Sequence, residues 1–204
     1  MWLICPETLK HYGYSMADIP LFYGDLSEDL RAQVTLVYRD KVNSPHDAFA
    51  QLSRLRNQIP DAENCLVTYG PPSWVHDLQL AGLHLPDNAN IQEVRSRLKG
   101  NVSLGISRHR STLQGNEGRE GADYVFLSPI FTPISKTIKN EALGLTEFKL
   151  LAQKADTKVF ALGGVNSTNM PLIKESGVFG AVFLGAIFQN AKSRTTLQET
   201  CSSW

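Results

Sequence analysis

The stretch GADYVFLSPIFTPISK, from Gly121 to Lys136, joins a short apolar run to a polar loop. The apolar residues from Tyr124 to Leu127 predict a buried β-strand, and hydroxyl groups, prolines and one lysine follow it directly. Parallel α/β proteins place their ligands at the carboxyl ends of their strands. The stretch therefore predicts a parallel sheet and one side of its ligand site.

Short apolar runs recur along the chain at a spacing of roughly 20 to 25 residues, which suits repeated βα units. Helical periodicity fills most of the intervening segments, and helix caps such as Ser44 before Pro45 support it. We predict strands at residues 2–5, 34–38, 64–68, 82–85, 102–106, 124–127, 158–162 and 181–184, and helices at residues 45–58, 73–81, 91–98, 111–120, 145–155 and 166–176. Eight such units form a single-domain (β/α)8 TIM barrel, with a flavodoxin-like open sheet as the alternative.

The composition is that of one domain, residues 1–204. With 204 residues, 42% of them hydrophobic, the chain can bury one sizeable core, which we place at about residues 34–188; a polar tail, residues 193–204, is expected to fray. Lysine plus arginine and aspartate plus glutamate number 20 each, so the net charge does not favour a nucleic acid partner. Any anion site must therefore be built from a local group of basic residues.

The three cysteines, Cys5, Cys65 and Cys201, are far apart and lack the spacing of a disulfide framework or a zinc site. No apolar run approaches the ~18 residues that a membrane helix needs, and the amino-terminal residues do not form a signal peptide. We expect a cytoplasmic protein without a membrane partner. A homo-oligomer is compatible with the sequence. The acidic residues form no paired motif at strand ends, so we predict no metal site.

Arg39 and Lys41 follow the second predicted strand and lie two residues apart. If the strand alternation continues, both side chains point to one face, where they can hold a phosphate, while Asp40 points away. The alternative is a solvated loop.

Glycines follow the last two predicted strands, at Gly163, Gly164 and Gly185. Glycine lets backbone N–H groups approach an anion closely, and barrels commonly bind phosphate after strands seven and eight. These residues are our candidate phosphate seat.

Ser107 and His109 follow the fifth strand in the same spacing. A histidine can move a proton near neutral pH and a serine can hold an oxyanion, so we assign them a catalytic role, against the alternative of a structural histidine. His84 lies inside an apolar strand, and we interpret it as a core or rim histidine.

The loop after Leu127 offers Ser135 and Lys136 as further anion ligands, with Pro133 limiting its freedom. The alternative is a plain connection, against which the length of the loop argues.

Taken together, these motifs resemble the thiamine phosphate synthase superfamily, which includes the TenI-like thiazole tautomerases. The resemblance runs from Val34 to Phe188 and rests on an ordered set of motifs: R-x-K at Arg39, G-L-H-L at Gly82, G-x-S-x-H at Gly105, the stretch Gly121–Lys136, G-G-V at Gly163 and L-G-A-I at Leu184. It implies a TIM barrel. It also implies phosphorylated thiazole and pyrimidine ligands, a diphosphate held by Arg39, Lys41, Ser107, Ser135 and Lys136, and a thiazole phosphate on the backbone at Gly164 and at Leu184–Gly185.

Three departures separate this chain from the synthase pattern of that superfamily. Val37 stands where a synthase has glutamine, and Thr68–Tyr69–Gly70 stands for Asn-Asp-Asp, which holds the pyrimidine and Mg²⁺. Leu85–Pro86–Asp87 replaces the turn with the second Mg²⁺ carboxylate. Because departing pyrophosphate needs its charge neutralised, these losses weigh against synthase turnover.

We therefore expect an enzyme of thiamine biosynthesis of the tautomerase type, with His109 as general acid/base, which matches the position of that residue in TenI-like proteins. Its alternatives are an active synthase, in which Tyr69 stacks on the pyrimidine, and a non-catalytic protein that senses thiamine phosphates. No cofactor is expected, and Mg²⁺ only for the synthase.

Overall fold

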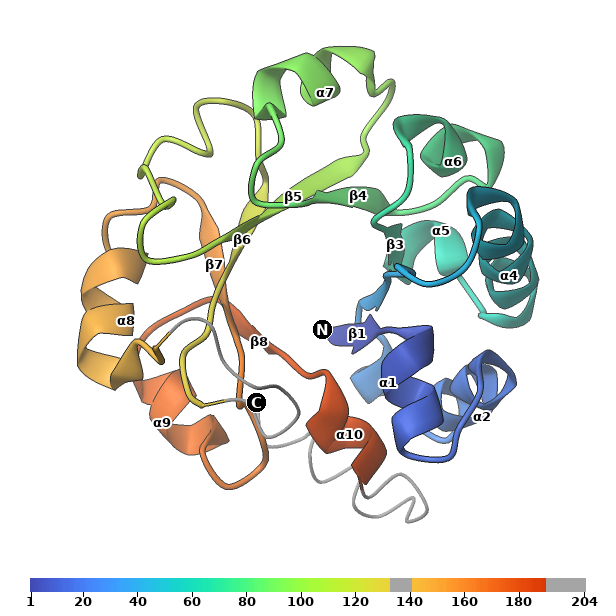
Figure 1. Cartoon of the computed structure of the whole chain (residues 1–204), viewed down its shortest axis with the longest axis horizontal. Coiled ribbons are helices and arrows are strands. Elements are labelled where there is room, and N and C mark those ends of the chain that lie inside the picture. The colour runs from blue at the N-terminus through green and yellow to red at the C-terminus, as the bar shows by residue number, and fades with distance from the viewer. Residues whose placement is uncertain (133–140, 190–204) are drawn as a thin grey trace.

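A computed structural model describes residues 1–132 and 141–189, and it contains eight parallel strands in one sheet. The strands follow one another in chain order: β1 (Trp2–Ile4), β2 (Leu36–Tyr38), β3 (Leu66–Thr68), β4 (Gly82–Leu85), β5 (Ser103–Arg108), β6 (Tyr124–Leu127), β7 (Lys158–Leu162) and β8 (Gly180–Val182). Viewed down the barrel, the helices form an outer ring around the strands (Figure 1). The predicted barrel is confirmed.

The sheet closes between its last and first strands. Trp2 and Phe183 form a parallel bridge, the Leu3 N–H donates to the Phe183 carbonyl at 2.8 Å, and the Phe183 N–H donates to the Met1 carbonyl at 2.9 Å. An open sheet would leave these groups unpaired. The flavodoxin-like alternative is therefore excluded.

The helices lie between the strands: α1 (Pro6–His11), α2 (Ile19–Gly24), α3 (Glu28–Arg31), α4 (Pro45–Gln58), α5 (Ala62–Cys65), α6 (Pro72–Asp77), α7 (Ile91–Arg97), α8 (Gly144–Ala152), α9 (Met170–Glu175) and α10 (Gly185–Gln189), with a 3₁₀ turn at Met16–Asp18. Ser44 caps α4 as predicted, because its side chain accepts from the Asp47 N–H. The predicted cap at Asn166 is wrong. Its side chain accepts from Thr168 and Asn169 N–H groups in a turn, and α9 begins only at Met170.

The helix predicted at residues 111–120 is also wrong, since the structure has only turns there. Glu117 explains the difference. Its buried carboxylate accepts from the N–H groups of Gln114 and Gly115 and from the Arg108 side chain at 3.1 Å. These hydrogen bonds and the buried ion pair hold the segment against the end of β5 in a conformation other than a helix.

The core has two parts, one between strands and helices and one inside the barrel. The inner part is aromatic at Tyr124, Phe126 and Phe160, and the whole core also includes residues before Val34, such as Trp2 and Ile19. A Cβ at Gly105 would overlap the Tyr124 ring, so glycine in β5 makes room for this filling.

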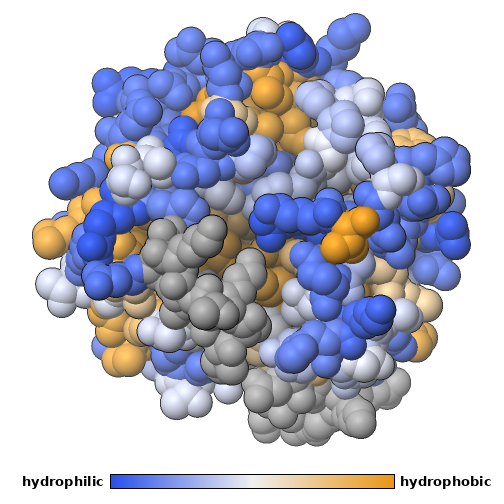
Figure 2. Space-filling view, in the orientation of Figure 1, coloured by the Kyte–Doolittle hydropathy of each residue, from blue (hydrophilic) through white to orange (hydrophobic). Residues whose placement is uncertain are grey.

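The face shown in Figure 2 is largely hydrophilic, with its exposed hydrophobic residues scattered among polar ones. In the part of the chain that the structure describes, no helix is both long and apolar enough to cross a membrane.

Candidate active site

The carboxyl ends of the strands bring most of the predicted site residues to one edge of the barrel. Arg39 follows β2, Ser107 lies near the carboxyl end of β5, and His109 comes directly after that strand. Leu162 of β7 pairs with Val182 of β8, and two residues further on these strands lead to Gly164 and Leu184. Residues that are far apart in sequence are therefore brought to one edge of the barrel.

At this edge, four planar side chains follow one another, with the successive rings tilted by 30–36°. The Arg39 guanidinium lies 5.2 Å from the centre of the Tyr69 ring, and that ring lies 4.6 Å from the His84 imidazole. His84 lies in turn 4.0 Å from Phe126, with an interplanar angle of 30°. We call Arg39, Tyr69, His84 and Phe126 the stack. It runs from the strand ends into the barrel interior.

Hydrogen bonds join the edges of the same rings. Ser107 Oγ lies 3.0 Å from the Tyr69 hydroxyl and 3.1 Å from His84 Nε2, and His84 Nδ1 lies 3.2 Å from the Tyr124 hydroxyl. Burial, helped by the charge of Arg39, holds the pKa of His84 well below its usual range, and burial raises the pKa of Tyr69 to about 12. The chain of groups is therefore uncharged at neutral pH.

One polar atom of the stack lacks a partner within the described residues. Arg39 Nε is buried and makes no hydrogen bond there. A buried N–H without an acceptor is costly, so this atom is a natural contact for an anionic ligand.

His109 is held differently from His84. Its Nδ1 lies 2.7 Å from the carbonyl oxygen of Ser128, which follows β6. Because a carbonyl can only accept, Nδ1 carries the proton, and Nε2 of the neutral ring is then the basic nitrogen. His109 is half-buried and Ser128 is buried. The arrangement is that of an oriented general base.

The glycines after β7 are needed for packing. Gly163 and Gly164 have φ of 99° and 65°, and Cβ atoms there would lie 2.8 Å from Pro129 and 2.7 Å from Phe131. A Cβ at Gly185 would lie 2.7 Å from the Tyr12 hydroxyl. These close approaches explain glycine without a ligand, so the phosphate seat at Gly163, Gly164, Leu184 and Gly185 stays a prediction.

The remaining predicted anion ligands, Lys41, Ser135 and Lys136, stay predictions. Strand pairing ends at Tyr38, so strand alternation does not orient Lys41, which is exposed. Asp40 accepts from the Tyr38 hydroxyl and from two N–H groups of the following turn. Ser135 and Lys136 lie outside the described residues.

The residues that would hold Mg²⁺ in a synthase fit the ion poorly. Gly70 offers no side-chain oxygen, and the Asp87 carboxylate lies 3.5 Å from the Arg108 guanidinium, whose positive charge opposes a second cation. Among residues 1–132 and 141–189, no group of three His, Cys, Asp or Glu side chains is arranged as a metal site.

Sequence reasoning missed three participants: Tyr69 as a partner of Ser107, His84 as the centre of the hydrogen-bonded chain, and Ser128 as the residue that orients His109. The available signal was positional. Each of them lies at or near the carboxyl end of a predicted strand.

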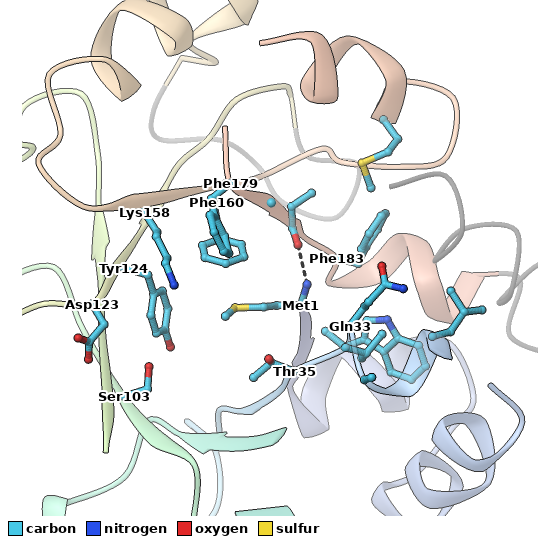
Figure 3. Close-up of a pocket in the computed structure, with 17 residues that line it drawn as sticks. Met1, Gln33, Thr35, Ser103, Asp123, Tyr124, Lys158, Phe160, Phe179 and Phe183 are labelled. Atoms are coloured by element: carbon cyan, nitrogen blue, oxygen red, sulfur yellow. Dashed lines mark hydrogen bonds between the residues drawn. The ribbon is translucent and has the colours of Figure 1, made fainter. Parts of the chain in front are cut away.

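A separate cavity of about 460 Å³ lies at the opposite end, around the strand starts (Figure 3). Lys158, Tyr124 and Met1 converge in it, and its walls include Phe160 and Phe179. It is mostly apolar, and Lys158 stacks on Phe179 at 4.5 Å. Barrels place their chemistry at the carboxyl ends of the strands, so we assign the active site to that edge and not to the cavity.

Comparisons with known proteins bear on the fold and on the family. A thiamine phosphate pyrophosphorylase structure from Pyrococcus furiosus superposes with a TM-score of 0.78 at 16% identity and covers 99% of this chain and 93% of that one, which shows the fold. Thiamine-phosphate synthases from Picrophilus torridus and Alcanivorax borkumensis are each 26% identical, over 87% and 75% of this chain and 89% and 71% of their own lengths. A Prochlorococcus marinus synthase is 33% identical over 48% of this chain, which spans only 28% of that relative.

The profile of the family described as thiamine monophosphate synthase matches residues 22–187, most of the chain. That segment contains the stack, both predicted catalytic residues and the glycines after β7 and β8. This protein therefore belongs to the thiamine monophosphate synthase family, a family of TIM-barrel enzymes.

Proposed function

We propose that this protein acts on a thiazole phosphate in thiamine biosynthesis and moves a proton within it, as a thiazole tautomerase. The orientation of His109 carries the proposal. With Nδ1–H held by the Ser128 carbonyl at 2.7 Å, Nε2 is fixed as the group that exchanges protons with a ligand.

In this mechanism, Nε2 of His109 takes a proton from one atom of the thiazole and returns it to another. The imidazolium formed between the two steps keeps its Nδ1–H bond to the Ser128 carbonyl, which stabilises the added charge. Protein and substrate each end with the charge they began with. No metal ion is required for such a proton shift.

The other predicted residues bind and orient the ligand. The phosphate lies on the backbone at Gly164 and at Leu184–Gly185, which the pairing of β7 with β8 brings to neighbouring positions. Arg39, with its unpartnered Nε, and Ser107 face negative charge at the opening. Lys136 completes this set as an expectation from the sequence.

His109→Ala tests the proposal. We expect proton exchange on a thiazole carboxylate phosphate to fall by roughly 10²- to 10⁴-fold, with the ligand still bound, because only the proton-transfer group is removed. His46→Ala is the matched control, since that histidine is exposed on α4. Full activity in the His109→Ala protein contradicts the mechanism. Tight binding without turnover in the wild-type protein identifies a sensor instead.

The second candidate is an active synthase, which the names of the relatives favour. Against it, strand register places Tyr69 between Arg39 and His84, and both contact its ring, at 5.2 Å and 4.6 Å, so the ring has less room to stack on a pyrimidine. Incubation with hydroxymethylpyrimidine diphosphate, thiazole phosphate and Mg²⁺ decides between the two. Thiamine phosphate formed at ~1 per second or faster supports the synthase.

A further inference from the structure

We propose that Tyr69 determines the specificity of this site by filling a slot shaped for a planar ring, so that the site accepts a thiazole phosphate but rejects a ligand that carries a second aromatic heterocycle. The inference deepens the proposed function and rests on it for the choice of ligand.

The slot is defined by the two groups that sandwich Tyr69. Strand register places Tyr69 between Arg39 after β2 and His84 of β4; the Arg39 guanidinium lies over the ring at 5.2 Å, and the tilted His84 imidazole lies 4.6 Å from it. Cationic and aromatic planes on both sides are the environment that an electron-rich ring prefers. In this protein the ring of Tyr69 occupies that environment.

The slot also has a polar wall. Ser107 Oγ and His84 Nε2 lie 3.1 Å apart, and the Tyr69 hydroxyl contacts Ser107 at 3.0 Å. A serine hydroxyl both donates and accepts, so the wall can recognise a ring nitrogen or an exocyclic amino group as readily as the phenol. The chemistry therefore matches a nitrogen heterocycle.

The floor of the slot is rigid. Phe126 stacks under His84 at 4.0 Å, and the Tyr124 hydroxyl holds its Nδ1 at 3.2 Å. His84 and Phe126 are fully buried in a filled barrel. Removal of the Tyr69 ring is thus expected to leave a ring-sized space, because the lining has little freedom to collapse.

The slot is reachable from the ligand side. Tyr69 comes directly after β3, at the carboxyl edge, and it is only half-buried. A ligand bound at this edge that carried a second ring would meet the Tyr69 ring where the slot opens.

The experiment compares the affinities of thiazole phosphate and thiamine phosphate, which has the additional pyrimidine, in the wild-type protein and Tyr69→Ala. We expect the wild type to prefer thiazole phosphate. We expect Tyr69→Ala to bind thiamine phosphate at least ~10-fold more tightly than the wild type, with thiazole phosphate changed by less than ~3-fold. Calorimetric titration measures both constants.

Tyr69→Phe is the matched control, because it keeps the slot filled and loses only the hydroxyl; it should retain the wild-type preference. Tyr69→Val serves if the alanine variant does not fold, since it retains apolar bulk but no ring. The inference is overturned if the wild type binds both ligands equally, or if opening the slot changes both affinities in parallel, as loss of a merely structural ring would. The proposed function fails separately, through turnover and His109→Ala.

Discussion

The two ends of the barrel each pair a cation with an aromatic ring, but the polar groups beside that ring differ. At the carboxyl edge, Arg39 covers Tyr69, and hydrogen bonds continue through Ser107 and His84 to Tyr124. At the amino edge, Lys158 covers Phe179 beside an apolar cavity of about 460 Å³. The cavity and the hydrogen-bonded chain therefore lie at opposite ends, and we base the candidate site on the connected polar groups at the carboxyl ends of the strands and not on the cavity.

The largest effect should come from the buried ion pair that closes the loop after β5. Arg108→Leu leaves the carboxylate of Glu117 buried without its cation and is expected to lower the free energy of unfolding by about 3–5 kcal/mol. Arg110→Leu is the control, because its ion pair with Glu147 is solvent-exposed and contributes about 0–1 kcal/mol. Urea unfolding measures both. Equal losses would mean that burial at the carboxyl edge confers no special stability on polar contacts.

A pH dependence should distinguish His84 from the exposed histidines. Its pKa is depressed in the folded protein but is near 6.5 in the unfolded chain, so the unfolded chain binds more protons below that pH. Stability is therefore fully present above pH ~6.5 and is lost on acidification, with a slope of up to about 1.4 kcal/mol per pH unit.

His84→Gln should flatten that slope, although it also lowers stability at pH 7. The measurement is the free energy of unfolding between pH 7.5 and pH 5, at about half-unit steps, in the wild type and the variant. Parallel curves would show that burial does not hold His84 neutral.

The smallest effect should come from the amino edge. Lys158→Ala removes a cation from the cavity wall, and we expect turnover of the thiazole phosphate to change by less than about twofold, because the cavity lies at the end where barrels do not place catalysis. A loss of turnover as large as that expected for His109→Ala would instead place the active site at the amino edge. Steady-state kinetics on both variants decides it.

Much of the barrel was readable from local patterns. The strands at residues 82–85, 124–127 and 158–162 were predicted with the bounds that the structure shows, because each is a short apolar run between clear breaks. The structure of the first part of the chain could not be predicted in this way, because Tyr12 and Ile19 pack against the barrel but the sequence around them has no regular periodicity.

The site was only partly readable. Strand ends predicted Ser107 and His109 as candidates, but the hydrogen bonds that link β4, β5 and β6 are set by strand register, which periodicity does not reveal. His84 is the clearest case. Its apolar neighbours predict a core residue, which it is, and yet the same burial makes it the centre of a polar chain. The prediction of a helix at residues 111–120 was wrong for a related reason, because the ion pair between Arg108 and Glu117 is a contact that periodicity does not reveal.

Gly105 limits the order in which substitutions inside the barrel can be accepted. Because its missing Cβ is where the Tyr124 ring lies, alanine at position 105 is tolerable only after position 124 has become smaller, and that change releases His84 Nδ1. The three positions are thus epistatic, with non-additive substitution effects. Single substitutions at these positions should each be destabilising, whereas a library that varies all three positions together can yield a barrel with a different set of interior hydrogen bonds.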